Sequence, residues 1–256
     1  MSITKSKFGI LYLLTGIIGL ALIIMTYFMP MWWVALQSHQ YPKSMYPKGI
    51  RIEFKYDGVY NGCEGVRERE ELAMDAGADC LIEMNKINHF IGMYPIVQGV
   101  NDVDELGNHV PYPVYAGDKI PPEEIPGALK MLDKIMRSAK YIFVLFFIFG
   151  LLFLVPKKST NILGIITALA PIFFLAIYIY YLWWYGHHLG LHGGGAFSGI
   201  KPFMPTVFGE GKVAQFTTES YPDKGFFIGL AGMLLMFISL AFKNKYIKES
   251  QTESAF

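Results

Sequence analysis

The feature that most constrains this chain is a set of long apolar runs without a single charged residue. There are four of them: Phe8 to Met29, Tyr141 to Val155, Asn161 to Tyr185 and Gly225 to Phe242. A helix needs about 20 apolar residues to cross a bilayer core. Three of the runs fit this length, and the second does so if its helix begins upstream near Leu129. The pattern predicts an integral membrane α-helical protein with four transmembrane helices.

Composition indicates the same class. The chain has 256 residues, of which 53% are hydrophobic, and a net charge of +1. This is too apolar for an ordinary soluble domain, and the charge gives no reason to expect nucleic acid as a partner. The first run is too long for the apolar core of a signal peptide, and no small-residue cleavage site follows at Pro30 to Trp33. We expect it to be retained as a membrane helix.

Lysines near the ends of the runs predict the orientation, because cytoplasmic loops are enriched in Lys and Arg. They lie in the N-terminal tail, the short loop after the second helix and the C-terminal tail: Lys5, Lys7, Lys157, Lys158, Lys243, Lys245 and Lys248. Both termini are therefore expected in the cytoplasm, with His39 to Arg137 and Gly186 to Lys224 outside it. The tryptophans at the outward helix ends fit an interfacial aromatic belt: Trp32, Trp33, Trp183 and Trp184. This layout predicts a multi-pass membrane protein with both termini in the cytoplasm.

The topology divides the chain into five parts. Residues 1–36 form a cytoplasmic tail and the first transmembrane helix, and 37–138 an extracytoplasmic domain. Residues 139–185 form transmembrane helices two and three with a short cytoplasmic loop. Residues 186–224 form an extracytoplasmic loop rich in His, Gly and Pro, and 225–256 the fourth helix and a cytoplasmic tail.

The domain between helices one and two is expected to be mixed α/β and to fold on its own. Ile50 to Tyr56 alternates apolar and polar residues, as in a half-buried strand. Arg67 to Phe90 is richer in helix formers, and Asn101 to Pro126 is turn-rich. The second outer segment has little periodicity, so we expect a long loop that lies against this domain.

Cys63 and Cys80 are the only cysteines, and both fall in the outer domain. An even count in an oxidising compartment favours one structural disulfide between them. The alternative is a thiolate pair for a soft metal or for redox exchange, but the sequence has no CxxC spacing.

Two further groups could bind a metal. In a helix, His89 and Met93 would share one face with Met84 nearby, and imidazole plus thioether outside the cytoplasm suits copper. The alternative is that the methionines fill the core while His89 satisfies a buried hydrogen bond.

The second group is GHHLGLHGGG, which contains His187, His188 and His192. Its glycines argue against a stable helix and favour a flexible capture site. The alternative is a histidine pair that merely lies among lipid head groups. Lys201 and Met204 in the following segment could add an anion contact or a ligand.

Several classes of protein are excluded by what the sequence lacks. No ionisable residue lies inside the four runs, which disfavours an ion-coupled transporter, and no histidine there could ligate a transmembrane haem. The sequence has no CxxCH, Walker, GxSxG, HExxH or Rossmann glycine motif. We therefore expect a protein that is not an enzyme.

Two blocks together resemble a known family. They are NHFIGMYPI from Asn88 to Ile96, and IKPFMPTVFG from Ile200 to Gly209 followed by QFTT and SYP. They resemble NosB-like membrane proteins that accompany the clade II type of nitrous oxide reductase, and they cover about a tenth of the chain. The resemblance implies a non-enzymatic accessory role beside a periplasmic copper enzyme, and a location in the bacterial inner (cytoplasmic) membrane. It makes a copper contact at His89 and Met93 more plausible, and it also suggests that both blocks form a docking surface that includes Pro202, Phe203, Met204 and Pro205.

Three hypotheses follow. The first is an accessory protein that anchors, assembles or copper-loads a periplasmic copper enzyme, with nitrous oxide reductase the suspected partner. The second is a redox subunit that passes electrons from quinol to a periplasmic acceptor through a haem or another cofactor on the outer face. The third is a structural subunit of a larger membrane complex. We favour the first, because the soft ligands all lie outside the cytoplasm and the apolar runs are free of charge.

Overall fold

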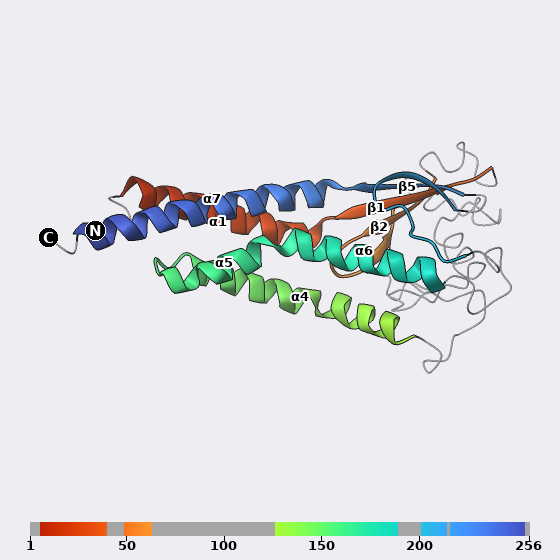
Figure 1. Cartoon of the computed structure of the whole chain (residues 1–256), viewed down its shortest axis with the longest axis horizontal. Coiled ribbons are helices and arrows are strands. Elements are labelled where there is room, and N and C mark those ends of the chain that lie inside the picture. Colours follow the sequence, from red (N-terminus) through yellow and green to blue (C-terminus); the bar gives the residue numbers. More distant parts are fainter. Residues whose placement is uncertain (1–5, 40–48, 63–125, 189–200, 214–215, 254–256) are drawn as a thin grey trace, which may run out of the picture. The chain divides into compact units, whose positions relative to one another are not determined.

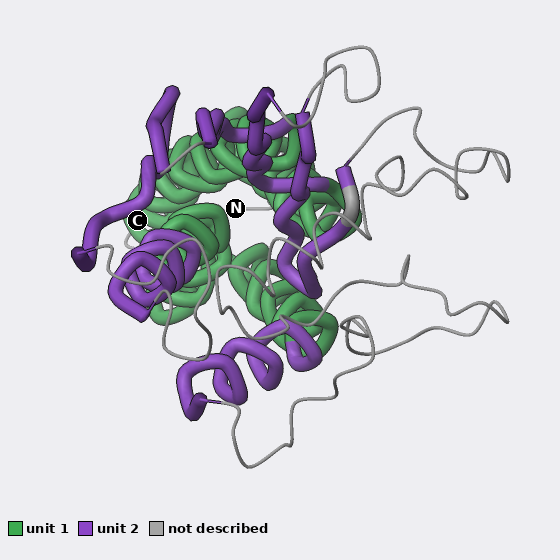
Figure 2. Tube along the Cα trace, turned by 90° about the vertical axis from the view of Figure 1, so that its right-hand side faces the viewer, with its two compact units in different colours: residues 1–29, 139–176, 224–256 green, residues 30–138, 177–223 purple. Residues whose placement is uncertain are grey.

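The computed structural model describes residues 6–39, 49–62, 126–188, 201–213 and 216–253 (Figure 1). Predictions for Cys63, Cys80, Met84, His89, Met93 and His192 lie outside these residues, as does the helix-rich segment Arg67 to Phe90. The chain divides into two compact units, which Figure 2 colours separately. The helical unit comprises residues 1–29, 139–176 and 224–256, and the sheet unit residues 30–138 and 177–223.

The helices follow the apolar runs closely. They are α1 (Lys7–Met25), which the 3-10 turn η2 (Thr26–Phe28) extends, α4 (Gly127–Phe153), α5 (Asn161–Ala168) preceded by the turn η3 (Lys158–Thr160), α6 (Ala170–His188) and α7 (Lys224–Glu253). The start of α1 is capped by Ser6, whose hydroxyl accepts a hydrogen bond from the Gly9 N–H at 3.2 Å. The prediction that the second helix begins upstream near Leu129 is confirmed, because α4 begins at Gly127.

Three helical segments of the described chain are long and apolar enough to cross a membrane: Lys7–Phe28, Gly127–Phe153 and Lys224–Glu253. A fourth exists if the segments Lys158–Ala168 and Ala170–His188, bent by 42° at their junction, count as one span. The sequence did not predict this bend. Its cause is Pro171, which has no N–H to donate to Thr167 and whose ring would clash with that carbonyl in a continuous helix.

Helices α1 and α7 of the helical unit pack backbone to backbone. A methyl group added to Gly19 would lie 3.0 Å from the Gly232 carbonyl oxygen, and one added to Gly232 would lie 3.0 Å from that of Gly19. Nearby, the Ser239 hydroxyl donates to the Tyr12 carbonyl at 2.7 Å. Small residues at the crossing permit this close approach, as in many membrane helix pairs.

A five-stranded antiparallel sheet dominates the sheet unit. Its strands are β1 (Trp32–Gln37), β2 (Ile50–Phe54), β3 (Val59–Asn61), β4 (Gly209–Val213) and β5 (Phe216–Pro222), in the order β3-β2-β1-β5-β4. The predicted strand from Ile50 is confirmed. The prediction that the first outer segment folds on its own is wrong for this sheet, because β1 pairs with β5 from the second segment along its whole length. That second segment was expected to be a loop and instead contributes two strands.

Candidate functional site

The sheet has one face for packing and one for polar contacts. Alternation along β1 sends Trp32 to the face that meets α6, where its ring lies 5.3 Å from that of Tyr178. Phe54 on β2 contacts the same tyrosine at 5.1 Å. The C-terminal half of α6 also packs on the first turns of α4 through a buried cluster: Val59, Leu129, Leu132, Met136, Tyr181 and Trp184. This packing fixes the end of α6 relative to the sheet.

Ser220 on β5 is the polar centre of the packed face. Its hydroxyl donates to the Val207 carbonyl at 2.7 Å and accepts from Trp32 Nε1 at 3.0 Å. Since the single Ser220 proton goes to that carbonyl, the Tyr178 hydroxyl donates to Ser220 Oγ at 3.1 Å. All three side chains are buried. Ser220 thus ties together β1, β5, α6 and the segment before β4.

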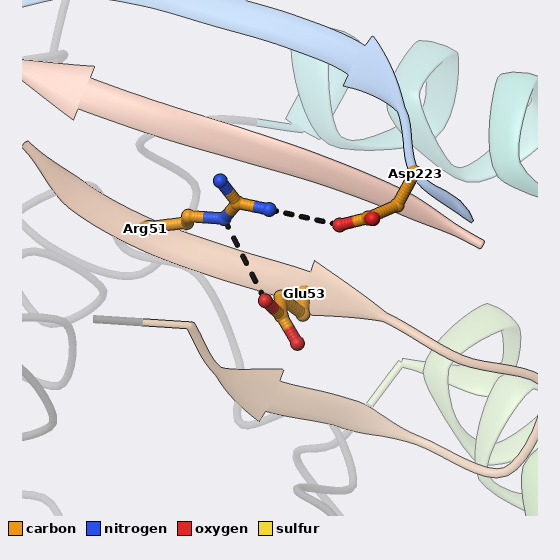
Figure 3. A network of polar contacts seen from close by, with 3 residues as sticks. All are labelled: Arg51, Glu53 and Asp223. Atoms are coloured by element: carbon orange, nitrogen blue, oxygen red, sulfur yellow. Dashed lines mark hydrogen bonds and ion pairs between the residues drawn. The ribbon is translucent and has the colours of Figure 1, made fainter. Parts of the chain in front are cut away.

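The opposite face carries a charged cluster at its centre. Arg51 reaches across β1, with its guanidinium carbon 4.4 Å from the Trp33 ring centroid and Nη2 2.8 Å from Oδ2 of Asp223 (Figure 3). Glu53 of the same strand lies 3.6 Å from Nε. Arg51 and Asp223 are mostly buried, at 15% and 12% side-chain exposure, so this pair is shielded from solvent far better than an ordinary surface pair. It ties β2 to the residue that precedes α7.

The segment 201–208, which we call the strap, is anchored on α6 at Gly186. The Phe203 N–H donates to the Gly186 carbonyl at 3.2 Å. A methyl group on Gly186 would overlap the Phe203 carbonyl oxygen, so only glycine permits this contact. Pro202 and Met204 of the predicted docking surface are exposed, whereas Phe203 and Pro205 are partly buried. Phe208 is 67% exposed and contacts Tyr221 edge-on at 5.4 Å.

His187 and His188 close the last turn of α6. The expectation that glycines prevent a helix here is wrong for both residues, since α6 runs through Gly186 to His188. His187 Nδ1 lies 2.8 Å from the Trp183 carbonyl oxygen, and His188 Nδ1 lies 2.7 Å from that of Trp184. Each ring also packs on the indole of the same tryptophan, with centroids 4.5 Å and 4.3 Å apart.

These contacts set the tautomer of both rings. A carbonyl oxygen only accepts hydrogen bonds, so each Nδ1 carries the proton and each neutral ring has its lone pair on Nε2. An imidazole that donates Nδ1–H to a carbonyl and ligates through Nε2 is a common arrangement in metal sites. The stacking holds the rings in fixed directions. The sequence pattern Trp-x-x-x-His, repeated in register, is the signal that could have predicted this arrangement.

The remaining predicted ligands are not tested. His89, Met84, Met93 and His192 lie outside the described residues, as do Cys63 and Cys80, and their roles stay predictions. Within the described residues, no three side chains of His, Cys, Asp or Glu converge as a metal site. Because neighbouring helical residues point about 100° apart, we do not expect His187 and His188 to complete a site by themselves.

Sequence reasoning missed the residues that hold this region together. Arg51 and Asp223 lay in no recognised motif, Ser220 was noted only as part of the family-like SYP block, and Gly186 was interpreted only as a helix breaker. Comparisons of the chain with protein-family models, with curated proteins and with solved structures gave no match.

Proposed function

We propose that the chain is a multi-pass membrane protein that docks on a periplasmic copper enzyme and assists its anchoring, assembly or copper loading. In this proposal it is not itself an enzyme. The lysine distribution supports cytoplasmic termini and an outward-facing sheet, and the candidate helices supply three or four spans. The family resemblance stated above supports nitrous oxide reductase as the partner and the bacterial inner membrane as the location.

The observation that carries the proposal is the pair of oriented histidines next to an exposed strap. Their Nε2 atoms are the ligand type that borderline and soft ions such as copper accept. Gly186, the anchor of the strap, immediately precedes His187, and Met204 with its thioether immediately follows Phe203. A site with few ligands of its own can bind copper weakly and pass the ion to a partner that supplies further ligands.

The exposed strap supports docking. Met204 is 44% exposed and Phe208 is 67% exposed, although the segment is anchored at both Gly186 and Ser220. A fixed apolar surface of this kind costs little ordering entropy when a partner binds. In this proposal, copper binding by His187 and His188 and docking by the strap therefore occur on neighbouring parts of the sheet unit.

The test is a gentle purification of the full chain with its native partners. Metal content and the visible spectrum are measured on the intact preparation, then for His187→Ala/His188→Ala and His89→Ala/Met93→Ala. His39→Ala is the matched control, because His39 is an exposed outer histidine remote in sequence from both groups. Copper that falls in one double variant and not in the control supports the proposal.

The other outcomes count against copper handling. A haem spectrum would favour the redox subunit that receives electrons from quinol. If the partner enzyme co-purifies but this chain carries no copper, anchoring or assembly remains as its role and copper loading is ruled out. If the partner is also absent and the histidine variants change nothing, the chain is a structural subunit with incidental histidines.

A further inference from the structure

One end of the helical unit concentrates positive charge. It is formed by the start of α1, the loop between α4 and α5, and the last turns of α7. The lysines gathered there are Lys7, Lys157, Lys158, Lys243, Lys245 and Lys248. The only carboxylates among the described residues of this unit are Glu249 and Glu253. Glu249 accepts a hydrogen bond from the Ser6 hydroxyl at 3.2 Å.

Lys243 differs from the other five lysines because it is completely buried. Its Nζ donates to the Phe153 carbonyl at 2.5 Å and to Thr160 Oγ1 at 2.7 Å. Phe153 is the last residue of α4, where the free carbonyls of a helix attract a cation. The ammonium also lies 4.4 Å from the Phe153 ring centroid. These contacts offset part of the cost of removing the charge from water.

Thr160 connects Lys243 to the loop between α4 and α5. Its hydroxyl donates to the Lys157 carbonyl oxygen at 2.8 Å, and Thr160 Oγ1 accepts the hydrogen bond from Lys243 Nζ. On the next residue, the Asn161 amide donates to Asn244 Oδ1 at 2.8 Å. The loop is therefore fastened to α7 on both sides of Lys243. This arrangement fixes the loop that carries the exposed residues Lys157 and Lys158 against the turn of α7 that carries Asn244.

Lys157 and Lys158 are adjacent in the chain and exposed, and like charges so near in sequence repel one another unless an anion lies beside them. Within the described part of the chain, neither of these two lysines forms an ion pair. The position of the lysines relative to the bilayer indicates which kind of anion lies beside them. The 18 apolar residues from Gly225 to Phe242 span about 27 Å as a helix, close to the ~30 Å thickness of a bilayer core. Lys243, which directly follows this run, therefore lies at the level of the lipid phosphates, and so does the loop that is fastened to it.

We propose that Lys157 and Lys158, with the Asn244 amide, form a binding site for the phosphate of an anionic phospholipid. Lys243 and Thr160 are its positioning residues, since they shape the loop without contacting the lipid. This site is separate from the histidine pair and the strap, and its existence does not depend on copper or on a partner enzyme.

The test uses the full chain in detergent and titrates phosphatidylglycerol against phosphatidylcholine, with bound lipid counted by native mass spectrometry. Lys157→Gln/Lys158→Gln is expected to weaken phosphatidylglycerol binding about 25-fold, because each lysine near an anionic lipid contributes about fivefold. Lys140→Gln/Lys224→Gln is the matched control. It removes the same charge from exposed positions in the middle of α4 and at the far end of α7. Equal losses in the two variants would overturn the site.

A second pair of variants tests the positioning role without changing charge. Thr160→Val removes the acceptor for Lys243 and should weaken phosphatidylglycerol binding at least several-fold, whereas Thr160→Ser should restore it. Unchanged selectivity in a folded Thr160→Val protein would contradict the positioning role. Competition by soluble glycerophosphate as strong as that by the lipid would identify a site for free phosphate esters and overturn the lipid assignment.

Discussion

His188 stacks on Trp184 with ring centroids 4.3 Å apart and an interplanar angle of 12°, while its Nδ1 donates to the Trp184 carbonyl. One residue earlier, His187 makes the same backbone contact with Trp183, and its ring lies 4.5 Å from the indole with a tilt of 31°. Both contacts are local to one helical turn, so the orientation of the rings depends on α6 reaching His188. Gly186 lies within that turn and also receives the strap.

The first prediction concerns the tautomer. In ¹⁵N NMR spectra of the histidine-labelled protein, the neutral rings of His187 and His188 should carry their proton on Nδ1. His187→Gln and His188→Gln assign the two signals. His39, an exposed histidine, is the internal comparison. Proton occupancy on Nε2 in either ring would show that the backbone hydrogen bond is not formed.

The second prediction concerns the strap. Gly186→Ala places a methyl group against the Phe203 carbonyl oxygen, so the strap must move, at a cost of about 1–3 kcal/mol. Limited proteolysis should then cleave within residues 201–208 faster than in the wild type. Gly127→Ala is the control, since a methyl group there meets nothing within 4 Å and should leave cleavage unchanged. Equal cleavage in both variants would show that the strap does not depend on Gly186.

The third prediction concerns Ser220. Ser220→Ala leaves Trp32 Nε1 and the Tyr178 hydroxyl without their shared partner in a buried site, which should cost about 2–4 kcal/mol of unfolding free energy. A red shift in tryptophan fluorescence should accompany the loss. Thr252→Ala removes a hydroxyl that bonds only to its own helix, and it should change neither quantity. A stable Ser220→Ala protein with unchanged fluorescence would refute the network.

The fourth prediction compares two ion pairs by double-mutant cycles. Arg51→Ala and Asp223→Ala should show a coupling of about 1–2 kcal/mol, because their charge-assisted hydrogen bond is mostly buried. Asp133 and Arg137 form an i,i+4 pair with 21% and 48% exposure, whose coupling should stay near 0.3–0.5 kcal/mol. Couplings of similar size would mean that the burial of Arg51 adds nothing.

The sequence predicted the elements whose signals are local. The charge-free runs located α1 and α7, and the need for a spanning length located the start of α4 near Leu129. Alternation from Ile50 located β2. Each of these signals depends only on the apolar pattern of one segment, which is why it could be read without knowledge of the partner segment.

The rest depended on pairing between distant segments. β5 buries Phe216, Thr218 and Ser220 on one face, but two of these are polar, so its alternation is hidden in the sequence. It pairs along its length with β1, whose residues lie 180 to 190 positions earlier in the chain. Gly186 illustrates the opposite error. Its low helix propensity led to the prediction that no stable helix forms there. In the structure, the close approach of Phe203 requires a glycine inside the helix.

The central claim is that the oriented histidines bind copper. Its most direct test is a Cu(I) titration of the purified full-length protein against a competing chelator. The wild type and His39→Ala should bind copper equally, and His187→Ala/His188→Ala should bind it at least tenfold more weakly. Equal binding by all three proteins, or none by the wild type, would contradict the claim.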